Sequence, residues 1–157
     1  RNYLAGTCDA FTTDASGLAS ARSSFPDPEN HIILPEIISK EPLGPVVRHG
    51  DNQWGDVVRW TFNALLIAEE KGITKANLAE VEASTTDPEV KRLLGLEGDF
   101  GVMAGLDNAA FKNAILASGN YGEIFEANIG AATPIGLARG LNALWTQGGL
   151  QYAPPFR

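Results

Sequence analysis

The feature that most constrains this sequence is a long amphipathic helical pattern near its middle. Mostly apolar side chains recur there at intervals of three and four residues, which places them on one helical face over three turns. They are Trp54, Val57, Val58, Thr61, Phe62, Leu65 and Leu66. Asp51 or Asn52 can cap the start of this helix, and Gly72 can end it. The pattern predicts a helix that buries this face against other parts of the chain.

Helical patterns also dominate the sequence after residue 73. Helices are predicted over residues 74–82, 88–94, 108–118, 121–129 and 135–145, with an extended tail over 152–156. Pro88 stands at the first position of the second of these helices, where a missing backbone N–H does no harm. This half of the sequence shows no candidate strand.

The first 48 residues have a different character. Residues 8–13 and 31–38 are rich in β-branched and apolar side chains and favour strands, although Pro35 divides the second. A short helix is predicted between them over 15–24, and a brief strand is predicted over 46–48. The order strand, helix, strand is typical of a parallel sheet, so the predicted fold class is α/β.

Composition excludes several classes of partner. The chain has 157 residues with 12 Lys and Arg against 19 Asp and Glu, a net charge of −7. Such a chain lacks the cationic excess that nucleic acids or anionic membranes require. No apolar run approaches the roughly 18 residues that span a bilayer.

Signals for catalysis or metal binding are equally sparse. His31 and His49 lie far apart in the sequence and have no second ligand type at helical spacing, so neither a metal site nor a cofactor is predicted. Cys8 has no partner for an internal disulfide, and we expect it to be a small buried side chain rather than a nucleophile. No catalytic residue is predicted.

One polar residue stands out. Asp14 follows the predicted strand 8–13 and precedes the predicted helix 15–24, at the sheet edge where α/β proteins bind ligands. Its carboxylate can cap the helix, or it can pair with a ligand ammonium group. Position alone favours the cap.

Four segments resemble one protein family. Residues 5–19 (AGTCDAFTTDASGLA) resemble the second lobe of periplasmic amino-acid-binding proteins of ABC importers. Residues 33–47 (ILPEIISKEPLGPVV) resemble the crossing back to the first lobe, and residues 119–125 (GNYGEIF) resemble a late helix. Residues 140–155 (GLNALWTQGGLQYAPP) are similar to the general L-amino-acid-binding subgroup, and the resemblance covers essentially the whole sequence.

The resemblance implies a two-lobed, type II periplasmic-binding-protein fold of the α/β class, present here as a C-terminal fragment with a mostly helical extension. It assigns residues 1–39 to the end of the second lobe, 40–45 to the inter-lobe crossing, 46–72 to the returning first lobe and 73–157 to the extension. It further implies that Asp14 binds the ammonium group of the ligand and that Thr13 borders the side-chain pocket.

The implied function is that of a non-enzymatic substrate-binding component. It captures L-amino acids in an inter-lobe cleft in the periplasm and delivers them to the membrane permease. The arginine that holds the ligand carboxylate in this family has no counterpart here, so we expect the fragment alone to bind weakly or not at all. Unpaired sheet edges favour a domain-exchanged or fragment-paired oligomer. The alternative is an enzyme on the same scaffold, such as a dehydratase of small carboxylates.

Overall fold

The computed structural model describes residues 2–157, which divide into two compact units. The first unit comprises the chain up to Gly44 together with Glu126–Ala138. The second comprises Pro45–Phe125 and Arg139–Arg157. Within the described part of the chain, no helix combines the length and apolar content that crossing a membrane requires.

The first unit is built around one short helix. Helix α1 spans Ala15–Ser23 and is followed by a 3-10 turn, η1, over Pro28–Asn30. Three rings meet beside it, because Tyr3 and Phe25 both contact His31, and the Tyr3 hydroxyl shares a 2.8 Å hydrogen bond with His31 Nδ1. Ala19 is the single buried hydrophobic residue described in this unit, so it has almost no core of its own.

The predicted strands do not form. Residues 8–13, 31–38 and 46–48 carry no strand, and the only β-pairing within residues 2–157 is an isolated bridge between Leu144 and Gln151. A strand exists only through hydrogen bonds to a neighbouring strand, and none is available to these segments. Their apolar side chains are therefore left exposed, as Ile38 at 84% and Val46 at 94% show. Residues 2–157 consequently do not confirm the α/β class.

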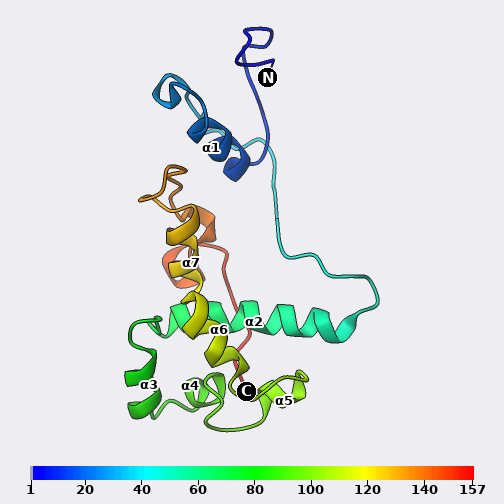
Figure 1. Cartoon of the computed structure of the whole chain (residues 1–157), viewed down its shortest axis with the longest axis vertical. Helices are drawn as coiled ribbons and strands as arrows, with labels where there is room; N and C mark the ends of the chain where they lie inside the picture. The colour runs from blue at the N-terminus through cyan, green and yellow to red at the C-terminus, as the bar shows by residue number, and fades with distance from the viewer. Residues whose placement is uncertain (1) are drawn as a thin grey trace. The chain divides into compact units, whose positions relative to one another are not determined.

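The second unit is helical, as the sequence predicted for most of it. Its helices are α2 (Asn52–Glu70), α3 (Leu78–Ser84), α4 (Pro88–Leu93), α5 (Phe100–Met103), α6 (Ala110–Ser118) and α7 (Tyr121–Asn128), with α7 ending in the first unit. The 3-10 turns η2 (Gly140–Asn142) and η3 (Trp145–Gln147) follow. Helix α6 packs against α2, the longest helix of the chain (Figure 1).

Two predicted helices differ from the structure. Helix α3 begins later than expected, because Thr74 and Asn77 exchange side-chain hydrogen bonds with each other's backbone N–H and hold a turn instead. The helix predicted over 135–145 is absent. Gly136 and Gly140 have φ values of +66° and +48°, which a right-handed helix cannot contain.

The core of the second unit closes around the chain terminus. Phe156 is fully buried, and its ring lies 5.2–5.4 Å, centroid to centroid, from the rings of Trp60, Phe100 and Phe111. Its backbone is held as well, since the N–H donates to Glu89 Oε1 at 3.0 Å and the carbonyl accepts from Arg92 Nε at 2.6 Å. The predicted extended tail is thus part of the core.

Candidate ligand-binding site

Asp14 lies at the N-terminus of α1 and caps it. Its Oδ2 accepts a 3.0 Å hydrogen bond from the backbone N–H of Gly17 and a 2.7 Å bond from the Ser16 hydroxyl. Its Oδ1 accepts from the Thr13 hydroxyl at 3.0 Å. The interpretation of Asp14 as a helix cap is therefore confirmed, and three donors fix the orientation of the carboxylate.

These donors also set the charge of the group. The Ser16 hydroxyl, then the Gly17 N–H and then the Thr13 hydroxyl stabilise the ionised carboxylate, so the pKa of Asp14 lies below its ordinary value. The side chain is half-buried and negatively charged at neutral pH. Because a carboxylate offers about four lone-pair sites, three donors leave it able to accept from a ligand cation.

Thr13 is exposed, and its side chain contributes a hydroxyl and a methyl group next to Asp14. Gly17 keeps this corner open. A Cβ at position 17 would lie 3.0 Å from both Asp14 Oδ1 and Thr13 Cγ2, closer than ordinary van der Waals contact. Ser16 and Gly17 are therefore supporting residues that the sequence interpretation missed. The signal was present, since a hydroxyl two residues after an N-cap Asp is well placed to reach its carboxylate.

The first unit contains a hollow whose lining does not include Asp14 or Thr13. The hollow that is found there, about 580 Å³ in volume, is lined by Arg22, Ser23, Pro28, Glu29, His31, Ile32, Ile33 and Pro134. This hollow is therefore not the ligand cleft that the resemblance places around Asp14 and Thr13.

The structure also describes the side chains that could bind a metal ion or act as a nucleophile. Across residues 2–157 no group of three or more His, Cys, Asp or Glu side chains is placed to hold a metal ion. Cys8 is a free thiol and is exposed, so the expectation that it would be buried is wrong. Residues 8–13 are all exposed and pair with no neighbouring strand, which agrees with the exposure of the thiol.

Comparison with known proteins gives a consistent result, although no family model matches the sequence. The chain is 73% identical over its full length to the glutamate/glutamine/aspartate/asparagine-binding protein BztA of Rhodobacter capsulatus, matching 46% of that protein. It is 59% identical to the general L-amino acid-binding periplasmic protein AapJ of Rhizobium johnstonii over 99% of the chain, again 46% of the relative. The putative amino-acid ABC transporter-binding protein YhdW of Escherichia coli is 50% identical.

A solved structure agrees with these relatives. The periplasmic binding protein of an ABC transporter from Brucella ovis, with glutathione bound, matches 99% of this chain and 49% of its own, with a TM-score of 0.94 and 55% identity. The chain is therefore a homologue of the periplasmic amino-acid-binding proteins of ABC transporters. It spans about half the length of the relatives it matches, and those relatives are named as binding proteins rather than enzymes.

Proposed function

We propose that this chain is the C-terminal part of the substrate-binding component of an ABC importer for L-amino acids, acting in the periplasm. The observation that carries the proposal is the match over all 157 residues of this chain, at 73% identity, to a protein named for binding glutamate, glutamine, aspartate and asparagine. The complete protein would close two lobes on its ligand and present the closed state to the membrane permease.

In this proposal Asp14 binds the α-ammonium group of the ligand. The carboxylate is ionised and oriented by Ser16, Gly17 and Thr13, so pairing needs no rearrangement of the helix N-terminus. Thr13 places its methyl group at the border of the side-chain pocket. The clamp for the ligand carboxylate would come from segments outside this sequence.

The same proposal accounts for the unpaired segments. Residues 8–13 and 31–38 would be strands of an α/β second lobe whose neighbouring strands lie outside this sequence. Residues 40–45 would form the inter-lobe crossing, and the change from the first to the second unit at Gly44 and Pro45 falls within this range. Residues 46–72 would return to the first lobe, and 73–157 would form the helical extension.

The ligand class follows from two shared chemical groups. Glutathione, which is bound in the Brucella ovis structure, ends in a γ-linked glutamate with a free α-ammonium and α-carboxylate. The amino acids named for the Rhodobacter capsulatus protein carry the same two groups. We expect this pair of groups, rather than one particular side chain, to be what the site requires.

Calorimetry on the complete protein tests the role of Asp14. Titration with glutamate, glutamine, aspartate, asparagine and glutathione establishes the wild-type affinities. Asp14→Asn keeps the helix cap but removes the charge, and should weaken every ligand on the order of tenfold or more. Asp51→Asn is the matched control, because Asp51 caps α2 through Trp54 N–H and should leave binding unchanged. Unchanged affinity in Asp14→Asn would remove this residue from the site.

The isolated 157-residue chain provides a second test. Lacking the rest of the pocket, it should bind free amino acids very weakly, and micromolar binding in the same calorimetry would contradict the proposal. Sedimentation at high concentration should show domain-exchanged or fragment-paired oligomers, because its extended apolar segments have no partners. A strictly monomeric profile would exclude this pairing.

A further inference from the structure

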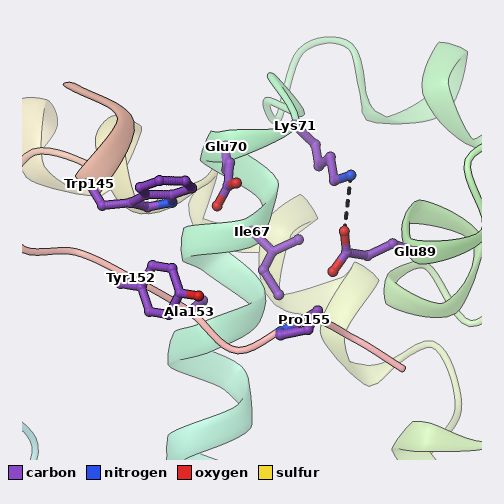
Figure 2. Close-up of a pocket in the computed structure, with 8 residues that line it drawn as sticks. All are labelled: Ile67, Glu70, Lys71, Glu89, Trp145, Tyr152, Ala153 and Pro155. Atoms are coloured by element: carbon purple, nitrogen blue, oxygen red, sulfur yellow. Dashed lines mark ion pairs between the residues drawn. The ribbon is translucent and has the colours of Figure 1, made fainter.

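The second unit contains a small cavity that the proposed function does not use. It lies beside the C-terminal end of α2 and the chain tail, and its volume is about 180 Å³ (Figure 2). Its lining consists of Ile67, Glu70, Lys71, Glu89, Trp145, Tyr152, Ala153 and Pro155. This volume is smaller than a typical pocket for a drug-sized ligand and suits a single side chain.

Aromatic and aliphatic groups form the walls and floor of this cavity. The rings of Trp145 and Tyr152 meet edge to face, with centroids 5.5 Å apart. Both remain open to solvent, at 49% and 67% exposed, whereas Ile67 and Ala153 below them are buried. The two rings therefore present π-faces that nothing in the described residues covers completely.

The charged side chains around the cavity differ in whether they already have a partner. Lys71 Nζ bonds Asp87 Oδ2 at 2.9 Å and Glu89 Oε2 at 3.0 Å, and the other oxygen of Glu89 accepts the Phe156 N–H. Glu70, in contrast, is exposed, and its side chain has no ion pair or hydrogen bond within residues 2–157. The Glu70 carboxylate is thus available to a ligand. Lys71, the only lysine in the lining, is already paired with the carboxylates of Asp87 and Glu89.

We propose that this cavity binds the guanidinium side chain of an arginine from a partner polypeptide. A guanidinium group can stack on an aromatic face and pair with a carboxylate at the same time. Trp145, Tyr152 and Glu70 all line this cavity. The aliphatic stem of the arginine lies along Ile67 and Pro155. The negative charge of Glu70 selects a cation over an anion or a neutral group.

The surroundings favour a polypeptide over a small free cation. Leu141 and Leu150 are neighbours, since the Leu150 N–H donates to the Leu141 carbonyl at 2.8 Å, and both side chains are more than half exposed. They belong to the same terminal segment as Trp145 and Tyr152 and offer apolar surface for residues that flank the arginine. A small free cation would leave this surface uncovered.

Nuclear magnetic resonance on the complete protein tests the proposal. The probe is N-acetyl-arginine N-methylamide, which has no free α-ammonium group and so does not address Asp14. The readout is the indole N–H signal of Trp145, identified by its loss in Trp145→Phe. We expect a saturable shift of this signal with the arginine probe and none with the neutral isostere, N-acetyl-citrulline N-methylamide.

Charge variants sharpen the test. Glu70→Gln should weaken binding about fivefold, as expected for one solvent-exposed ion pair. Glu80→Gln on α3 is the matched control, because Glu80 is also exposed and does not line the cavity. Both variants should retain the wild-type circular dichroism spectrum. The proposal is overturned by a Trp145 signal that does not respond to the arginine probe, or by equal affinity in wild type and Glu70→Gln.

The source of the cation is tested with propylguanidine, which carries the same group without a backbone. Binding of the blocked arginine with an affinity equal to or greater than that of propylguanidine supports a polypeptide partner. Binding of propylguanidine alone would show that the backbone is excluded and would overturn that assignment.

Discussion

Arg139 and Glu69 form a two-point ion pair that ties the segment after α7 to helix α2. Arg139 Nη1 lies 2.9 Å from Glu69 Oε1, and Nη2 donates to Oε2 at 3.1 Å. Both side chains are largely buried, at 18% and 12% exposed. The guanidinium group also lies 5.2 Å from the ring centroids of Tyr121 and Phe125, so it is held by charge and by two aromatic rings.

Removing one partner of this pair should destabilise the second unit. Arg139→Met leaves the Glu69 carboxylate partly buried without its counter-charge, and we expect a loss of about 1–3 kcal/mol in the free energy of unfolding. Urea denaturation followed by circular dichroism measures the change. Arg59→Met is the control, since Arg59 and Asp56 form an exposed pair at 3.6 Å that should contribute under about 0.5 kcal/mol. Equal losses in both variants would show that burial of the pair has no effect.

The buried terminus gives a second prediction about stability. Phe156→Ala removes a fully buried ring that touches three others, and such truncations cost about 3–5 kcal/mol. Leu150→Ala, in the same tail but 71% exposed, should change stability by less than about 0.5 kcal/mol. Thermal unfolding of the two variants measures these losses of stability. Similar losses in both variants would show that the end of the chain lies on the surface and is not part of the core.

The Lys71 cluster predicts a pH dependence with two limbs. Hydrogen bonding to Lys71 lowers the pKa of Asp87, so this contribution to stability is present above about pH 3.9 and disappears as pH falls through the folded-state pKa. The hydrogen bonds that Lys71 donates to Asp87 and then to Glu89 raise the pKa of Lys71. Its contribution is complete below about pH 10.4 and disappears as pH rises through the folded-state value.

Substitution separates these limbs. Asp87→Asn keeps the N-cap of α4 but loses the charge, and should flatten the acid limb of a plot of unfolding free energy against pH. Lys71→Met should flatten both limbs, because it removes the shared partner. Urea unfolding between pH 3 and 11 measures both profiles. An acid limb that stays as steep in Asp87→Asn as in wild type would assign the dependence to other groups.

Local patterns were sufficient to predict only part of this fold. Helix α2 was predicted correctly because a 3.6-residue period from Trp54 to Leu66 and a capping Asp51 are encoded in consecutive positions. The helix expected over 135–145 failed although Leu137 and Leu141 matched the period. Two glycines in the left-handed region outweigh a weak apolar pattern, and the sequence alone does not reveal their φ values.

Features that depend on distant residues were missed. The strand expected over 31–38 has the right composition, but a strand is completed by a neighbour, and none of the described residues supplies one. The docking of Phe156 depends on Arg92 and Glu89, more than 60 positions away, which no local period encodes. Asp14 was identified as a helix cap because the start of the helix that follows it is local information. Its ligand role stays a prediction.

The charge state of Asp14 gives a final prediction that needs no ligand. The Ser16 hydroxyl is the largest cause of its lowered pKa, ahead of the Gly17 N–H and the Thr13 hydroxyl. Ser16→Ala should therefore raise the pKa of Asp14 toward its ordinary value by more than Thr13→Val does. Carboxyl-carbon NMR titration of Asp14 in the three proteins measures these shifts directly. A larger effect from Thr13→Val would mean that Oδ1, which accepts from the Thr13 hydroxyl, is held more strongly than Oδ2.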